Sequence, residues 1–151
     1  MVLRAVNRSA GTLRFHTDAR SPKCAGLRGG QVSVLAYHPG DALQIRLAGI
    51  ARVTTEGAEV EAAWLSSTTF ARRCYLAEKA PGSALPAPGS GLPAWAEGHK
   101  PDEADLLPAR ANFALVTVEV SAIDWLHLAE GGHRRVQFSA IDNWRGAWVV
   151  P

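Results

Sequence analysis

Residues 12–23 read TLRFHTDARSPK, and this stretch decides the fold because an alternating strand runs directly into a polar, cationic turn. Leu13, Phe15 and Thr17 fall on one face of the predicted strand. Arg14 and His16 fall on the other face. Such alternation is typical of a strand that buries one of its faces.

The turn after this strand is predicted to open a short helix. We expect Ser21 to be the helix N-cap and Pro22 the first helical residue. Backbone N–H groups, the helix dipole, Lys23 and Arg20 would then converge on one spot, which suits a phosphate. The alternative is an ordinary helix start with a solvated lysine, and this segment alone leaves both interpretations open.

Most of the remaining chain is predicted to be antiparallel β-structure. We expect strands over 2–6, 31–38, 42–54, 113–128 and 134–140. Pro39-Gly40-Asp41 and Glu130-Gly131-Gly132 supply the turns of two hairpins. The sequence therefore predicts a mainly β single domain over 1–151, a small β-barrel with attached helices.

Two further segments complete this outline. A helix is predicted over 56–76, with Val60, Ala63 and Trp64 facing the core. Residues 80–110 are rich in proline, glycine, serine and alanine and are predicted to form a long loop. Leu92 and Trp95 are expected to fold back from this loop onto the body of the domain.

Composition excludes several classes of protein. The 151 residues carry 16 basic and 14 acidic side chains, a net charge of +2, which is too balanced for nucleic acid or an anionic membrane as the main partner. Cys24 and Cys74 lack metal-ligand spacing with the histidines, so we expect no metal site and reduced thiols in a cytoplasmic protein. There is no apolar run of membrane-spanning length and no signal-peptide layout. Because residues 2–6 are already predicted to form a strand, the sequence is expected to start within the domain, and a further element could precede Met1.

Four segments, taken in order, resemble one family: the pyridoxamine 5′-phosphate oxidase-like flavoproteins, or FMN-binding split barrels. The segments are VLR at 2–4, TDARSPK at 17–23, QIRLAG at 44–49, and IDW at 123–125 with HRRVQF at 133–138. The resemblance runs over the whole chain. It implies an antiparallel, Greek-key-like split barrel that forms a homodimer, with FMN in clefts between the subunits and a small-molecule substrate.

The resemblance also implies a set of FMN-binding residues near the N-terminus. The family has a phosphate-binding arginine just before the VLR strand, at a position that precedes Met1, and Arg4 and Arg20 are the residues that would share its duty. The set is Val2, Leu3, Arg4, His16, Thr17, Arg20, Ser21 and Lys23. His16 and Thr17 would lie beside the flavin, with Ser21 and Lys23 on the phosphate.

Three later residues complete the implied cofactor site. Gln44 would lie against the edge of the flavin ring, and Trp125 and Arg135 match positions that reach the flavin of the neighbouring subunit. A solvated glutamine and a core tryptophan are the alternatives. His133 is the best candidate for a general acid or base, and its alternative role is only to cap the hairpin.

Departures from the oxidase pattern bear on the substrate. Gly131 stands where the oxidases have an arginine for the substrate phosphate, and Thr68 and Arg72 stand where they have an arginine and a serine. The vitamin B6 phosphate site is therefore predicted to be absent. We expect an FMN-dependent oxidoreductase of unknown substrate. A pyridoxamine 5′-phosphate oxidase proper, a reductase with a nicotinamide or deazaflavin donor, and a non-enzymatic FMN carrier remain open from sequence.

Overall fold

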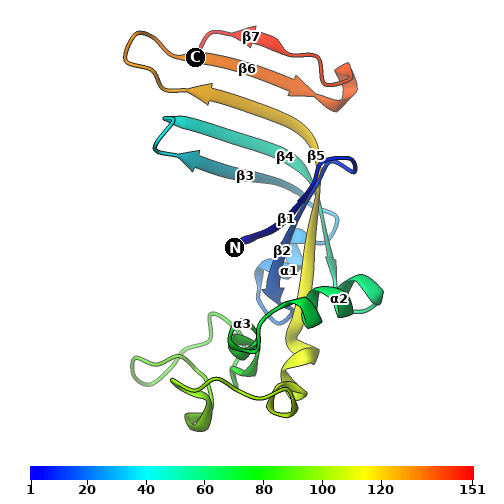
Figure 1. Ribbon diagram of the computed structural model, residues 1–151, viewed down its shortest axis with the longest axis vertical. Helices are drawn as coiled ribbons and strands as arrows, with labels where there is room; N and C mark the ends of the chain where they lie inside the picture. Colours follow the sequence, from blue (N-terminus) through cyan, green and yellow to red (C-terminus); the bar gives the residue numbers. More distant parts are fainter.

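The computed structural model describes residues 1–151 and is mainly β, with a few short helices (Figure 1). Its seven strands form one antiparallel sheet in the order β1-β2-β5-β4-β3, with β6 paired to β5 and β7 paired to β6. The strands are β1 (Leu3–Asn7), β2 (Thr12–Asp18), β3 (Gln31–His38), β4 (Leu43–Thr54), β5 (Phe113–His127), β6 (Arg134–Ser139) and β7 (Ala147–Val149). The mainly β prediction is confirmed. The sheet of one chain is open, so its closure into a barrel stays a prediction.

The predicted strands are confirmed to within one residue at nearly every boundary, and the predicted hairpin of β3 with β4 is present. Strand β7 is the exception, because it has only three residues and too little alternation for the sequence to reveal it. The faces of β2 also agree with prediction. Leu13, Phe15 and Thr17 are buried, whereas Arg14 and His16 are only partly buried.

A bulge in β5 bends the sheet into two parts. One edge of β5 pairs first with β2 and then, beyond Ser121, with β6, while the other edge pairs with β4 throughout. At this point β4 passes so close that a Cβ on Gly49 would lie 2.2 Å from the carbonyl oxygen of Glu119. Only glycine fits there. We call the part with β1 and β2 the lower sheet, and the part with β3, β6 and β7 the upper sheet (Figure 1).

The predicted continuous helix over 56–76 is wrong. The structure has α2 (Ala58–Ser66), α3 (Thr69–Arg72) and a 3₁₀ turn (Arg73–Leu76). The chain is extended at Ser67, and the Thr68 hydroxyl accepts a hydrogen bond from the Ala71 N–H and so caps α3. The hydroxyls of Ser66 and Ser67 both donate to the carbonyl of Ala63. These local hydrogen bonds compete with the backbone bonds that would continue the helix.

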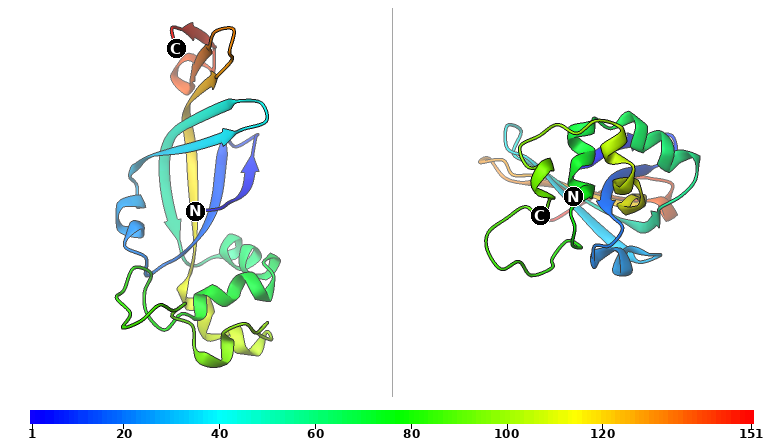
Figure 2. Two further views of the ribbon diagram at one scale, coloured as in Figure 1. Left: turned by 90° about the vertical axis from the view of Figure 1, so that its left-hand side faces the viewer. Right: turned by 90° about the horizontal axis from the view of Figure 1, so that it is seen from below.

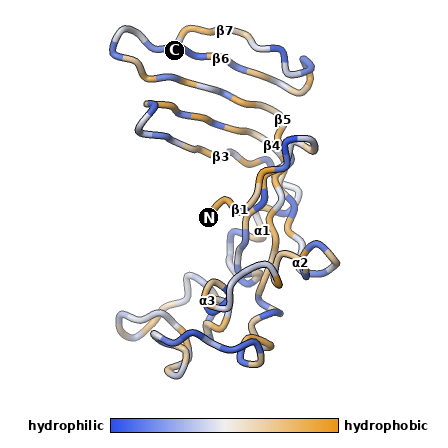
Figure 3. Tube along the Cα trace, viewed as in Figure 1, coloured by the Kyte–Doolittle hydropathy of each residue, from blue (hydrophilic) through white to orange (hydrophobic).

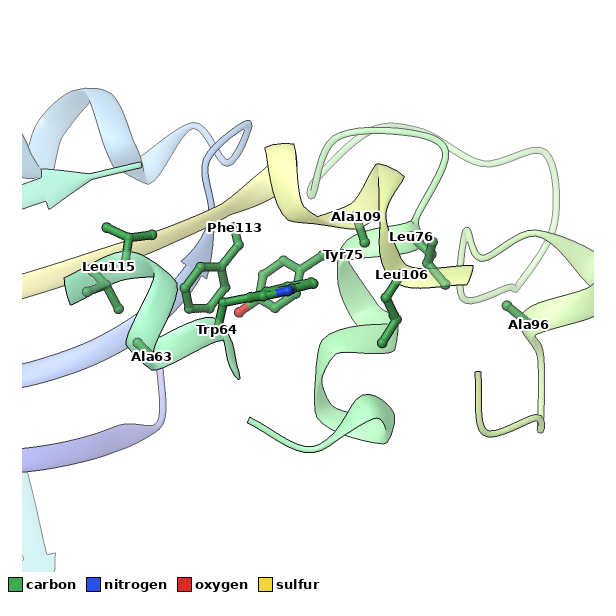
Figure 4. Packing of buried hydrophobic residues seen from close by; sticks show 10 residues of the cluster. Ala63, Trp64, Tyr75, Leu76, Ala96, Leu106, Ala109, Phe113 and Leu115 are labelled. Carbon is green, nitrogen blue, oxygen red and sulfur yellow. The ribbon is translucent and has the colours of Figure 1, made fainter. Parts of the chain in front are cut away.

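The larger hydrophobic core lies between the lower sheet and the helices (Figure 4). Phe113 of β5 meets Trp64 and Tyr75 edge to face, with ring centroids 5.3 and 5.2 Å apart. Val60 and Ala63 are buried with Trp64, as predicted. A second, smaller cluster lies on the opposite face of the lower sheet and is centred on Leu13, Phe15, Ala51, Val116 and Val118.

Residues 80–110 form the predicted long loop, interrupted by short 3₁₀ turns at Ala94–Ala96, Ala104–Leu106 and Pro108–Asn112. The loop and the helices gather at one end of the molecule, and the hairpin of β6 and β7 lies at the other (Figure 2). Leu92 packs against the larger core, as predicted. The prediction for Trp95 is wrong, because its residue is 51% exposed. None of the helices has the length and apolar character needed to cross a membrane.

Candidate functional site

The turn after β2 is held by Asp18 and Arg20. The Asp18 carboxylate accepts hydrogen bonds from the Arg20 backbone N–H at 2.8 Å, from Nε at 3.0 Å and from Nη2 at 2.7 Å. Nη2 also donates to the carbonyl of Ala77, 2.9 Å away. The hydrogen bond to Asp18 raises the pKa of Arg20. The Arg20 side chain therefore holds this turn against Ala77, the residue after the 3₁₀ turn that follows α3. Most of its donors are used within the chain.

Ser21 is not the helix N-cap, contrary to prediction. Its N–H donates to the Asp18 carbonyl and its own carbonyl accepts from Cys24, so the turn continues one residue further and Pro22 takes the N-cap position of α1 (Lys23–Leu27). Ser21 is nevertheless buried at the turn. Lys23 is exposed and forms no salt bridge within the chain. It is therefore a free cation beside a buried hydroxyl.

His16 lies on β2 two residues before the end of the strand. Its ring packs edge to face on Phe113, with centroids 4.9 Å apart. Burial, followed by the charges of Arg4 and Arg14, lowers the pKa of His16 to about 4, so the imidazole is neutral near pH 7. Its Nε2 is buried and has no hydrogen-bond partner. A buried polar atom of this kind is costly unless a partner satisfies it.

The charge of Arg4 affects this histidine and also two side chains in the 3₁₀ turn that follows α3. Burial raises the pKa of Tyr75, and the charge of Arg4 opposes that rise. The same opposition holds for Cys74, whose pKa is also raised by burial. The positive charge of Arg4 thus acts on the pKa of all three side chains. Cys74 and Tyr75 were not predicted as site residues, because both fall in a segment whose pattern is that of an ordinary helix.

The other predicted N-terminal residues are placed differently. Thr17 is buried on the opposite face of β2 from His16, against the smaller core. Val2 and Leu3 are exposed at the edge strand β1. The end of β2, the segment that follows it and the neighbouring strand β1 therefore carry four of the predicted residues, His16, Ser21, Lys23 and Arg4. We call these four residues the β2-turn group.

The later predicted residues lie on the upper sheet. Gln44 of β4 and Arg135 of β6 both pair with Leu126 of β5, so they share one face of the sheet on either side of it. Trp125 lies on the opposite face, where its ring is 6.5 Å from that of Trp148. Trp125 and Arg135 therefore do not face the same side of their own chain.

Arg135 is held by a residue that the sequence analysis did not select. Its Nε and Nη2 donate to the carboxylate of Asp124, and Gln137 adds a third hydrogen bond at 3.3 Å. The hydrogen bond from Arg135 is the main cause of a lowered pKa at Asp124. A signal was present in the sequence, because the alternation of the 113–128 strand and the register of its hairpin put Asp124 beside Arg135.

The two sets of predicted residues lie towards opposite ends of β5. Thr17 pairs with Ala114 and Gln44 pairs with Leu126. An extended strand would separate those partners by roughly 40 Å, although the bend shortens the direct distance. His133 is exposed in the turn between β5 and β6, away from the β2-turn group. No group of three or more histidine, cysteine, aspartate or glutamate side chains has the arrangement of a metal site.

Arg72, at an oxidase phosphate position, is paired within the chain through its terminal nitrogens, while its buried Nε has no partner. Its residue is 3% exposed, and its two terminal nitrogens donate to the Glu103 carboxylate at 2.9 and 2.5 Å. The guanidinium also stacks over Trp64, 5.0 Å from the ring centroid. Thr68 is used as the cap of α3. These residues fasten the 80–110 loop to the helices.

No protein-family model matches the chain, and no curated protein matches it. Among solved structures, it is similar to a pyridoxamine 5′-phosphate oxidase-related, FMN-binding protein from Nostoc punctiforme PCC 73102, with 22% identity and a TM-score of 0.73 over 99% of this chain and 78% of the other. It is also similar to PhzG from Burkholderia lata 383, solved in complex with tetrahydrophenazine-1-carboxylic acid, with 18% identity and a TM-score of 0.71 over 99% and 72% of the two chains. At these identities the likeness concerns the fold, and at that level it confirms the resemblance predicted from the sequence: the chain has the fold of the pyridoxamine 5′-phosphate oxidase-related proteins.

Proposed function

We propose that this chain is an FMN-binding flavoprotein that acts as a flavin-dependent oxidoreductase. The observation that carries the proposal is the fold shared, over 99% of the chain, with a protein described as FMN-binding. When bound, FMN would supply the hydride chemistry, and the protein would supply binding, orientation and electrostatics.

The β2-turn group fits the polar parts of this cofactor. Lys23 and Arg4 are exposed cations suited to a phosphate, and charge-assisted hydrogen bonds to phosphate are among the stronger ones in proteins. Ser21 adds a hydroxyl beside Lys23. His16 is neutral and has a buried Nε2 without a partner, so it fits an uncharged polar group of a ligand rather than the phosphate.

We propose further that the protein acts as a homodimer with the cofactor between subunits. Within one chain, the β2-turn group and the upper-sheet residues lie apart, and a second chain is the simplest way to bring them together. Apolar and polar residues alternate along strands of the upper sheet (Figure 3), and strand pairing puts the apolar ones on the face that carries Trp125. Its residues are Val32, Val34, Ala36, Ile45, Leu47, Ile123, Trp125, Val136, Phe138 and Trp148.

That apolar face favours Trp125 over Arg135 as the residue that meets the neighbour's flavin. Trp148 on this face is 71% exposed in the single chain, and its burial against a second copy would be favourable. Arg135 lies on the polar face and is engaged by Asp124. From that face, the Arg135 side chain could contact the flavin of a second chain only by extending past the end of the strands. Closure of the open sheet into a split barrel belongs to the same proposal.

The substrate is proposed to be something other than pyridoxamine 5′-phosphate. Arg72 is 3% exposed and donates from both terminal nitrogens to Glu103, so its guanidinium is poorly placed to bind a substrate phosphate. Gly131 carries no side chain that could bind a phosphate. This specific arrangement argues against the alternative of an oxidase proper.

The proposal is tested by the visible absorption spectrum of the purified protein, with mass identification of the compound released by heat. We expect a flavin spectrum and FMN. A colourless protein that does not bind added FMN would contradict the proposal. Bleaching of bound flavin by a nicotinamide or deazaflavin donor would identify a reductase, and oxygen-dependent formation of pyridoxal 5′-phosphate would identify an oxidase. FMN binding without turnover would identify a carrier.

A further inference from the structure

A cleft of about 560 Å³ lies at the bend of the sheet, between the β1–β2 turn and the loop before β7. This volume is in the usual range of small-molecule sites. The apolar part of its lining includes Val6, Leu13, Leu47, Val120, Ile123 and Trp144. None of the predicted flavin-binding residues lines it.

Trp144 is held in this cleft by an unusual backbone. Its φ is 60° and that of Asn143 is 51°, a left-handed conformation that bulky side chains rarely adopt. The Trp144 N–H donates to the Ser139 carbonyl at 2.8 Å, and the Asn143 N–H donates to Ala140 at 3.2 Å. The backbone of Trp144 is therefore fixed beside the cleft, which the residue lines while it stays 40% exposed.

The opposite rim carries a free positive charge. Arg8 lines the cleft and has no salt bridge within the chain. The only carboxylate in the lining is that of Glu119, which lies 3.9 Å from Arg52. The turn that carries Arg8 is ordered by Asn7, whose side-chain oxygen accepts hydrogen bonds from the Ser9 hydroxyl and the Ala10 N–H.

We propose that this cleft binds a small planar aromatic anion, with its rings against Trp144 and the aliphatic wall and its acidic group at Arg8. An aromatic ring gains both apolar burial and a directional contact from an exposed indole. A carboxylate or sulfonate complements the unpaired guanidinium. The site is separate from the β2-turn group, so the inference does not depend on the proposed flavin function. Its lining shares Leu47 and Ile123 with the apolar face that we assign to the dimer, so the inference requires that the second copy leave this end of the face open.

The test is calorimetric titration of the purified protein with naphthalene sulfonate and with the uncharged naphthalene methanol. We expect one saturable sulfonate site per chain. Trp144→Ala should weaken sulfonate binding roughly tenfold, and Trp144→Phe, which keeps a ring, should weaken it less. Arg8→Gln should weaken the sulfonate about threefold and leave the alcohol unchanged.

Matched controls are Trp95→Ala, another exposed tryptophan, and Arg28→Gln, another exposed arginine, both of which should bind as the parent does. Unchanged affinity in both Trp144→Ala and Arg8→Gln would overturn the proposal. Equal losses in the controls would also overturn it, because they would indicate general apolar adsorption. Loss of binding as protein concentration rises would show that a second copy covers the cleft, and that outcome too would overturn the proposal.

Discussion

Arg135 and Asp124 form a two-point ion pair across strands β6 and β5, with Nε and Nη2 donating to the two carboxylate oxygens at 2.9 and 2.6 Å. The pair lowers the pKa of Asp124 in the folded protein. A carboxyl whose pKa is lowered by folding stabilises the fold above its unfolded pKa, and the stabilisation is lost as the pH falls through the folded value.

We therefore expect Arg135→Ala to raise the pKa of Asp124. The variant should also lose the part of the free energy of unfolding that the parent protein loses as the pH falls through that pKa. Carboxyl-carbon NMR titration measures the pKa directly. Arg134→Ala is the control, because Arg134 bonds only to the carbonyls of Gly132 and His133. An Asp124 pKa that does not respond to Arg135→Ala would show that the ion pair is absent in solution.

His16 gives a second pH-dependent prediction. Its pKa falls from 6.5 to about 4 in the folded protein, so unfolding is favoured as the pH drops from about 6.5 towards 4. Histidine-ring NMR should find His16 uncharged at pH 5.5. Arg4→Gln should raise the pKa of His16, since a nearby positive charge is removed. A His16 ring that is charged at pH 5.5 would refute the buried environment.

Removal of the Glu103 carboxylate should destabilise the protein. Glu103→Ala leaves the buried Arg72 guanidinium without its partner, at an expected cost of about 1–3 kcal/mol. Chemical denaturation measures this change, and Glu130→Ala, at an exposed glutamate without a salt bridge, should change the free energy of unfolding by no more than about 0.5 kcal/mol. Equal effects of the two variants would mean that the Arg72–Glu103 pair does not fasten the loop.

The proposed dimer has its own test. Trp148→Glu places a charge on the apolar face of the upper sheet and should weaken association at least about a hundredfold, since an unpaired charge is costly to bury. Light scattering at micromolar concentration reports the mass. Leu107→Glu, at an exposed leucine far from that face, is the control. A monomeric parent protein that still holds FMN would contradict the dimer.

The sequence was a good guide to the sheet and a weaker guide to the side chains. Long alternating segments such as 113–128 define their own strands, because one face must be buried. The bend was not predictable, since it depends on Ser121 being left unpaired between Val120 and Ala122, where β4 passes close at Gly49. The helix break at Ser67 and Thr68 was missed because hydroxyl hydrogen bonds to the backbone do not disturb the apolar pattern.

The candidate site shows the same limit. Arg20 was selected for its place in the turn after β2 and Arg135 through the family resemblance, but each forms an ion pair with an aspartate that was not selected, Asp18 or Asp124. Which charge is free depends on strand register and on turn geometry. Lys23 and Arg4 are the selected cations that remain exposed and without a salt bridge in the chain.

The most direct test of the central claim compares the affinities of FMN and riboflavin for the parent protein and for Lys23→Ala, by fluorescence or calorimetric titration. The account predicts that the parent prefers FMN, and that Lys23→Ala loses about 1.5–3 kcal/mol, or roughly ten- to a hundredfold, for FMN while hardly affecting riboflavin. Lys100→Ala, at another exposed lysine, should leave both affinities unchanged. Equal affinity of the parent protein for FMN and riboflavin would contradict the phosphate role of the β2 turn.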